Sequence, residues 1–274
     1  MAATDGSHGA ALQRAQALAE QYAALDHVRA VALAGSYAAD TADAFSDIDL
    51  YVYATAPVSP AARAAVAAAD RRAEIDNRWF GPEDAWIDPE SGLNIDVVFR
   101  ATAWVEEELQ RVLVRHEART GYSTAFWANV LASRPLVDTT GWFARLKRRA
   151  QQPYPEQLRH AIIALNLPLL RQAQSAYGRQ LEKAVARRDL VSVNHRVAAL
   201  LASYFDILFA LNRIPHPGEK RLIDAAIERC RLLPPSMRQH LDALLRTAGI
   251  PDPQVLRWAS ALTAELEDLV SRNA

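Results

Sequence analysis

The first 115 residues alternate between helical and strand-like hydrophobic patterns. Residues 11–25 carry apolar side chains at helical spacing, which predicts an opening helix. Residues 28–33 form a short apolar run, and residues 47–53 alternate polar with apolar side chains as a half-buried strand does. The later patterns predict one more helix and two more strands, separated by glycine- and proline-containing loops. They cover residues 59–69, 74–80 and 92–99, with loops at Gly81-Pro82 and Asp88-Pro89.

Beyond Arg115 the strand patterns end and long helical periodicities take over. Apolar stripes at helical spacing predict helices within residues 158–169, 193–211 and 223–230. A last helix is predicted after Asp252-Pro253, because aspartate caps exposed amides and proline suits the first helical turn. An antiparallel bundle of about five helices would bury these stripes.

These patterns predict an α+β fold with two domains. Residues 1–115 would form a small mixed sheet with flanking helices, and residues 116–274 would form a C-terminal α-helical bundle. Half of the residues are apolar, which is enough to build a core in each domain. The apolar stripes of the bundle would also allow a homodimer.

The composition limits where the protein works and what it binds. The first ten residues lack the basic and apolar regions of a secretory signal, and no apolar run reaches the roughly 18 residues of a membrane span. The one cysteine, Cys230, cannot form an internal disulfide, which favours a reducing cytoplasm. Lysine and arginine number 31 against 32 acidic residues, so the chain lacks the excess positive charge that nucleic acids attract. We therefore expect a soluble cytoplasmic protein without membrane or nucleic-acid partners.

Three aspartates on predicted strands are the candidate metal ligands. Asp47 and Asp49 are two residues apart on one strand, so they share a face, and Asp96 stands in the apolar series of a later strand. Carboxylates that repel each other suit Mg²⁺, a hard cation that prefers oxygen ligands. We expect Asp47, Asp49 and Asp96 to hold Mg²⁺, as two ions about 4 Å apart in the general two-metal arrangement. Asp96 is also the candidate general base.

The turn after the first predicted strand is the candidate phosphate site. Gly35 and Ser36 end that strand within a run of small residues. Free backbone amides and the Ser36 hydroxyl can bind the β- and γ-phosphates of a nucleoside triphosphate, and Gly35 lets the phosphates approach closely. Ten residues separate this turn from Asp47, which is enough for a short helix and a return to an adjacent strand.

In this order, Gly35-Ser36, Asp47-Ile48-Asp49 and Ile95-Asp96-Val97 resemble the signature of the polymerase-β-like nucleotidyltransferase superfamily, over about residues 28–100. With its helical bundle, the chain is similar to the small bacterial members that adenylylate aminoglycosides or lincosamides. The resemblance implies an N-terminal nucleotidyltransferase domain in which Ser36 contacts the triphosphate and Asp47 and Asp49 bind metal. Asp96 would bind metal or activate the acceptor hydroxyl. Residues 37–40 lack the second glycine that antibiotic-modifying members often carry there.

A second segment, residues 208–220, joins two predicted helices and resembles a junction seen in relatives of this family. Lys220 follows a turn that contains proline and glycine, so it could reach the triphosphate as a mobile point charge. The alternative is a helix start at which Lys220 and Arg221 are solvated.

Three further acids have open interpretations. Asp206 lies in an apolar segment, so its charge needs a partner, which would be Arg196, Arg171 or a cationic acceptor. Glu74 and Asp76 stand where related antibiotic enzymes can place an extra acid, and they fit a solvated strand edge equally well.

These residues and the resemblance predict a Mg²⁺-dependent nucleotidyltransferase. It would transfer a nucleoside monophosphate, AMP from ATP, to a hydroxyl of a small-molecule acceptor and release pyrophosphate. Antibiotic modification is one such reaction. The same chemistry on a protein side chain or an RNA end is an alternative. A second alternative is a regulatory protein in which a nucleotidyltransferase-like domain binds a nucleotide or a partner.

Overall fold

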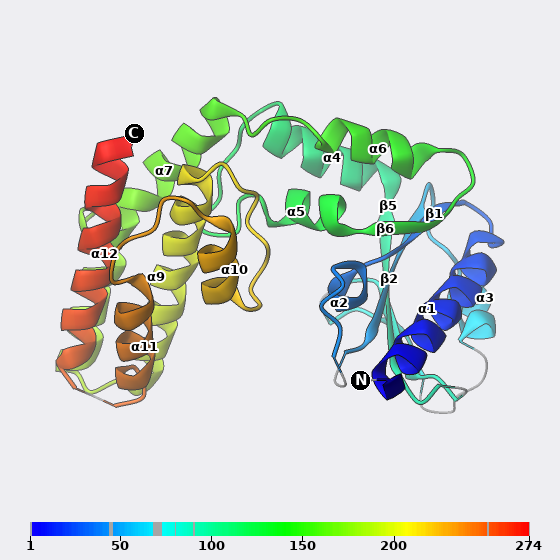
Figure 1. The fold of residues 1–274 in the computed structure, drawn as a ribbon, viewed down its shortest axis with the longest axis horizontal. Coiled ribbons are helices and arrows are strands. Elements are labelled where there is room, and N and C mark those ends of the chain that lie inside the picture. Colours follow the sequence, from blue (N-terminus) through cyan, green and yellow to red (C-terminus); the bar gives the residue numbers. More distant parts are fainter. Residues whose placement is uncertain are drawn as a thin grey trace. The chain divides into compact units, whose positions relative to one another are not determined.

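The chain forms two compact units (Figure 1). The computed structural model of the protein describes residues 2–43, 46–67, 73–79, 81–89, 91–250 and 252–273. Unit 1 comprises Met1–Leu109 and Asn129–Gln152, and unit 2 comprises Gln110–Ala128 and Pro153–Ala274. This division differs from the boundary predicted at residue 115, because the chain returns to unit 1 before it completes unit 2.

Unit 1 is built on a six-stranded sheet in the order β3-β4-β5-β2-β1-β6. Strands β2 and β5 run parallel, and the other neighbouring pairs are antiparallel, so the predicted mixed sheet is confirmed. The strands are β1 (Val28–Leu33), β2 (Ile48–Ala54), β3 (Glu74–Asn77), β4 (Glu83–Ile87), β5 (Asn94–Ala101) and β6 (Arg134–Asp138).

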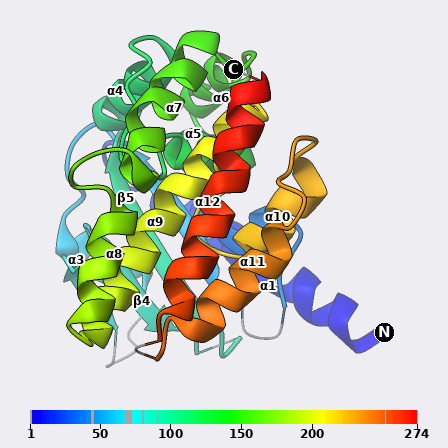
Figure 2. The ribbon, with the colours of Figure 1, turned by 90° about the vertical axis from the view of Figure 1, so that its left-hand side faces the viewer.

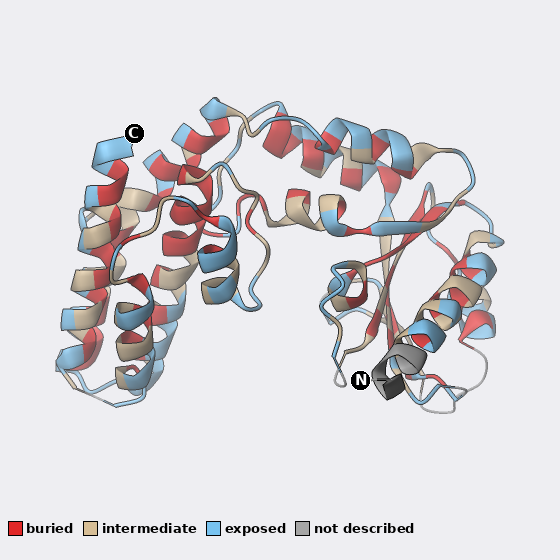
Figure 3. Cartoon of the chain, in the orientation of Figure 1, coloured by how far each residue is buried: buried red, intermediate tan, exposed pale blue. Residues whose placement is uncertain are grey.

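Alternation along β2 and β5 separates the two faces of the sheet. Leu50 and Val97 are buried in one cluster with apolar side chains of α1 (Ala2–Ala23), which lies along this face (Figure 1, Figure 3). Residues at the alternate positions, among them Asp49 and Asp96, belong to the opposite face. Unit 1 also contains α2 (Gly35–Ala38), α3 (Pro60–Val66) and α6 (Trp142–Ala150), whereas α4 (Thr102–Leu113) and α5 (Ala125–Ala132) each run from one unit into the other.

The sequence patterns did not predict two strands of the sheet, β4 and β6. Strand β6 pairs antiparallel with β1 at an edge of the sheet, so the expectation that strands end near Arg115 is wrong. A proline and two charged ends conceal its pattern, and edge strands tolerate such residues. Strand β4 was missed because Asp84 faces the core, where its Oδ2 accepts a hydrogen bond from Arg63 Nε at 2.9 Å.

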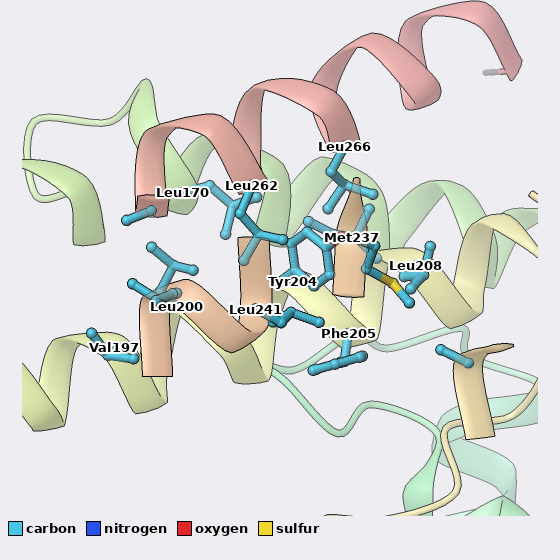
Figure 4. Close-up of a cluster of buried hydrophobic side chains, with 14 of the residues drawn as sticks. Leu170, Val197, Leu200, Tyr204, Phe205, Leu208, Met237, Leu241, Leu262 and Leu266 are labelled. Carbon is cyan, nitrogen blue, oxygen red and sulfur yellow. The ribbon is translucent and has the colours of Figure 1, made fainter. Parts of the chain in front are cut away.

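Unit 2 is helical, and Figure 2 shows α8, α9 and α12 side by side. The predicted helices are present as α7, α9, α10 and α12, whereas α8 and α11 were not predicted. Tyr204 of α9 lies in the core among Met237, Leu241 and Leu262 (Figure 4). The helices are α7 (Glu156–Arg171), α8 (Tyr177–Ala186), α9 (Leu190–Leu211), α10 (Leu222–Arg229), α11 (Met237–Thr247) and α12 (Gln254–Asn273).

The start of α12 follows its capping residue as predicted. The Gln254 N–H donates a hydrogen bond to Asp252 Oδ1 at 2.8 Å, which satisfies an amide that would otherwise lack a partner. Among the helices that the structure describes, none combines the length and the apolarity needed to cross a membrane.

Candidate active site

The three predicted acids lie at one end of the central strands, where β1 ends and β2 and β5 begin. The parallel register pairs Asp49 directly with Asp96, so these carboxylates stand on neighbouring strands and on the same face. Asp47 lies just before β2, and its Oδ1 accepts a hydrogen bond from Asn94 Nδ2 at 2.9 Å. This end of the strands therefore concentrates negative charge on one half-buried rim of unit 1.

The turn after β1 is fastened to the same end of the strands. The Ala34 N–H donates to the backbone oxygen of Asp49 at 2.9 Å. Gly35 has a φ of +60°, and a Cβ at this position would lie 1.8 Å from Asp49 Oδ2. The glycine predicted to admit phosphate therefore also makes room for the carboxylate of Asp49. Ser36 follows in the first turn of α2, where backbone N–H groups have no intrahelical acceptor.

A cluster that sequence analysis did not single out continues along this face. The guanidinium carbon of Arg100 lies 4.1 Å from the ring centroid of Tyr51. Asn129 joins the pair, because its Nδ2 donates to the Tyr51 hydroxyl at 2.9 Å and its Oδ1 accepts from Arg100 Nη1 at 3.3 Å. Strand alternation from Asp49 and Asp96 was the available signal, since Tyr51 and Arg100 stand at even spacing from them.

Glu83 adds a fourth acid to the same face. On β4, Ala85 pairs with Asp96, so Glu83, two residues before Ala85, lies on the same face of the sheet as Asp96. Burial raises the pKa of Glu83, and the charge of Asp96 raises it further. By contrast, Asp76 accepts hydrogen bonds from Arg63 and Arg78 and is not part of this rim.

The donor chemistry of the rim fits Mg²⁺, because carboxylate oxygens are its preferred protein ligands. In the described part of the chain, no three His, Cys, Asp or Glu side chains are already close enough to hold a metal ion. Asp47, Asp49 and Asp96 nevertheless lie at the same end of the strands. Metal binding therefore stays a prediction.

Lys220 lies on unit 2 and is exposed. The turn before it is held by His216, whose backbone N–H donates to Thr124 Oγ1 at 2.8 Å and whose Nδ1 accepts from the Gly218 N–H at 3.2 Å. Burial lowers the pKa of His216 to about 4, so this imidazole stays neutral and keeps its acceptor nitrogen. The approach of Lys220 to a triphosphate is a prediction that these contacts do not test.

Asp206 is buried in unit 2, as predicted, but the prediction that an arginine is its partner is wrong. Its Oδ2 accepts from the Ser123 hydroxyl at 2.6 Å, and its Oδ1 accepts from the Ser123 N–H at 3.0 Å. Arg171 instead pairs with Glu267. The partners are neutral, and burial raises the pKa of Asp206 to about 7. Only 1% of the residue is exposed, which keeps it away from an acceptor in solution.

The replacement Asp206→Asn is expected to flatten the dependence of stability on pH. Because the folded protein holds the Asp206 proton more tightly than the unfolded chain does, its free energy of unfolding falls as pH rises from about 4 to about 7. Between pH 5 and pH 8 the free energy of unfolding of the wild type should fall by on the order of 2 kcal/mol more than that of the variant. Urea unfolding at both pH values measures the difference. The exposed Asp224→Asn is the matched control, and an identical pH dependence in Asp206→Asn and wild type would contradict the assignment.

Comparison with known proteins supports the class expected for the N-terminal region. Residues 15–118 match the family model of the nucleotidyltransferase domain, so the chain carries an N-terminal nucleotidyltransferase domain followed by a helical region. Residues 123–221 match a second family model, described as a domain of unknown function (DUF4037). The superfamily expected from the sequence is supported, and its antibiotic-modifying specificity stays a prediction.

Among solved structures, the chain is similar to a nucleotidyltransferase-like protein from Exiguobacterium sibiricum 255-15. The two are 13% identical with a TM-score of 0.47, and the match covers 95% of this chain and 74% of that protein. No curated protein matches the chain.

Proposed function

We propose that this protein transfers a nucleoside monophosphate, AMP from ATP, to a hydroxyl of a small-molecule acceptor. The observation that carries the proposal is the direct pairing of Asp49 with Asp96 beside the Gly35 turn. It joins an acidic rim to a turn that begins α2, where the first N–H groups have no acceptor within the helix, and these are the two parts that nucleotidyl transfer requires. The match of residues 15–118 to the nucleotidyltransferase domain supports this choice.

In the proposed reaction, a bond forms between the acceptor oxygen and the α-phosphorus, and the bond from that phosphorus to the β-phosphate oxygen breaks. Pyrophosphate leaves. Ser36 and the first amides of α2 would bind the β- and γ-phosphates, and Asp96 would accept the proton of the acceptor hydroxyl. Asp47 and Asp49, together with Asp96, would hold Mg²⁺, which supplies charge neutralisation of the triphosphate.

The acceptor is proposed to be a small hydroxyl-bearing molecule. The balance of 31 basic against 32 acidic residues supports this class over RNA, because many RNA-binding proteins carry an excess of positive charge that neutralises the phosphates. Aminoglycosides and lincosamides are the first acceptors to screen, since the motif order resembles the enzymes that modify them.

Thermal stabilisation by nucleotides tests the proposal without knowledge of the acceptor. ATP with Mg²⁺ is expected to raise the unfolding temperature more than GTP, CTP or UTP does. A native-state ligand at a hundredfold excess over its dissociation constant adds about 2.7 kcal/mol of stability. The double variant Asp47→Ala/Asp49→Ala should lose the effect, whereas Glu74→Ala, an exposed strand acid, should keep it. If no triphosphate stabilised the wild type, the partner-binding alternative would replace the enzyme.

A further inference from the structure

A cavity of about 350 Å³ opens at the end of the sheet opposite the acidic rim. Ala54 and Ala101, the last residues of the parallel strands β2 and β5, line it together with residues 55–60. Asp49 stands five residues before Ala54 on β2, so the cavity lies about 17 Å from the rim along the strand. In sheets with parallel strands, ligands commonly bind at the carboxyl ends of those strands.

Arg78 is the arginine of the cavity lining that has only one acidic partner, Asp76. Of the other two lining arginines, Arg63 also pairs with the buried Asp84, and the Arg100 guanidinium lies over Tyr51 on the other face of the sheet. Arg63 Nη1 donates to Asp76 Oδ1 at 3.0 Å, and Arg78 Nη2 lies 3.2 Å from both Asp76 oxygens. The Arg78 side chain is 70% exposed, so part of its five-donor fork faces solvent although Asp76 holds it in place. A held guanidinium with outward N–H groups is suited to bind an anion.

Asp76 is held in an unusual backbone conformation. Its φ is +60°, within the irregular pairing of β3 with β4. Its N–H donates to the buried Asp84 carboxylate at 2.8 Å, which stabilises this conformation from the core side. Aspartate adopts left-handed backbone more readily than most residues with a side chain, and residues held in this conformation cluster at binding and active sites. Here it places a carboxylate between two arginines at the mouth of the cavity.

The remaining wall is apolar and rigid. Phe99 lines the cavity, and the guanidinium of Arg63 lies 4.0 Å from its ring centroid. Three prolines, Pro57, Pro60 and Pro82, restrict the backbone around it. Pockets of this kind, mostly apolar with a few placed polar groups, accommodate small organic ligands.

We propose that this cavity binds a small organic anion with an apolar or aromatic body. Arg78 contacts its carboxylate or phosphate group, and the body lies against Phe99 and the prolines. The site is separate from the acidic rim, so it does not depend on the proposed nucleotidyl transfer.

Isothermal titration of the full chain with phenyl phosphate, benzoate and benzylamine tests the proposal. At least one anion is expected to bind one site with a dissociation constant of about 0.1 to 1 mM, and the amine is expected not to bind. Binding of phenyl phosphate alone would identify a phosphate ligand, and binding of benzoate alone a carboxylate. Saturating ATP with Mg²⁺ should leave the titration unchanged. Failure of ATP to bind would affect the proposed function but not this site.

Two variants locate the bound anion. Arg78→Glu reverses the charge at the mouth, and Ala101→Trp fills the cavity from an exposed position. Each should weaken anion binding at least about tenfold, whereas Arg148→Glu, at an exposed arginine of α6, should not. Urea midpoints verify folding, and Ala101→Trp alone decides the matter if Arg78→Glu does not fold. Absence of binding by both anions, or equal binding in all variants, overturns the proposal.

Discussion

Replacement of Asp49 by asparagine is expected to lower nucleotidyl transfer about a thousandfold, which corresponds to about 4 kcal/mol of transition-state stabilisation. Asparagine keeps the size of the side chain and the backbone hydrogen bond from Ala34, so the turn and the sheet should persist. It removes the negative charge that, with Asp96 on the neighbouring strand, would hold Mg²⁺. The loss should therefore be chemical and not structural.

Pyrophosphate release from ATP measures this effect, in the presence of a panel of hydroxyl-bearing acceptors that includes aminoglycosides and lincosamides. Glu74→Gln is the matched control because it neutralises an exposed strand acid away from the rim, and its rate should stay within about twofold of wild type. Far-UV circular dichroism and the urea midpoint verify that both variants fold. If Asp49→Asn kept full activity, Asp49 would have no role in the reaction. An equal loss of activity in Glu74→Gln would show that the rate responds to the loss of any acidic side chain and not to Asp49 in particular.

Gly35→Ala is expected to destabilise unit 1 by about 3 kcal/mol and to abolish transfer. The added Cβ would lie 1.8 Å from Asp49 Oδ2, so the carboxylate or the turn must move. The positive φ of Gly35 adds a cost of about 1 to 2 kcal/mol for any residue with a side chain. Urea unfolding with a probe of the sheet measures the stability.

The variant Gly92→Ala separates the steric cost of Gly35→Ala from its backbone cost. Gly92 also has a positive φ, +71°, but no atom of the described residues lies within 4 Å of the place that its Cβ would take, so only the backbone cost of about 1 kcal/mol applies. The double variant Gly35→Ala/Asp49→Gly should recover part of the stability but none of the activity, because the clash disappears together with the carboxylate. If Gly35→Ala cost no more than Gly92→Ala, the contact with Asp49 would be irrelevant.

Local periodicity was sufficient for much of the candidate site. The alternation of residues 47–53 predicted a strand with Asp49 on its polar face, and β2 has this arrangement. The order of Gly35-Ser36, Asp47-Ile48-Asp49 and Ile95-Asp96-Val97 predicted the nucleotidyltransferase domain that residues 15–118 match. Side-chain direction along a strand depends only on neighbouring residues, so a sequence contains this information.

Contacts between distant residues carried the information that periodicity lacks. Strand β4 appears polar in the sequence until Arg63, 21 residues earlier, pairs with the buried Asp84. Asp206 was expected beside an arginine, and it binds Ser123, 83 residues away. In each case the expectation for a polar side chain was based on its residue type alone. In the folded chain its hydrogen bonds are made to a distant residue that no local sequence pattern indicates.

From the sequence alone came the mixed sheet, the helical region that follows it, and the residues of the acidic rim. Tertiary structure was needed to show that β6 returns the chain to the sheet after residue 115, and that Gly35 makes room for Asp49. Hydrophobic periodicity is a property of adjacent residues. Strand partners and the space around a side chain depend instead on segments that only folding brings together.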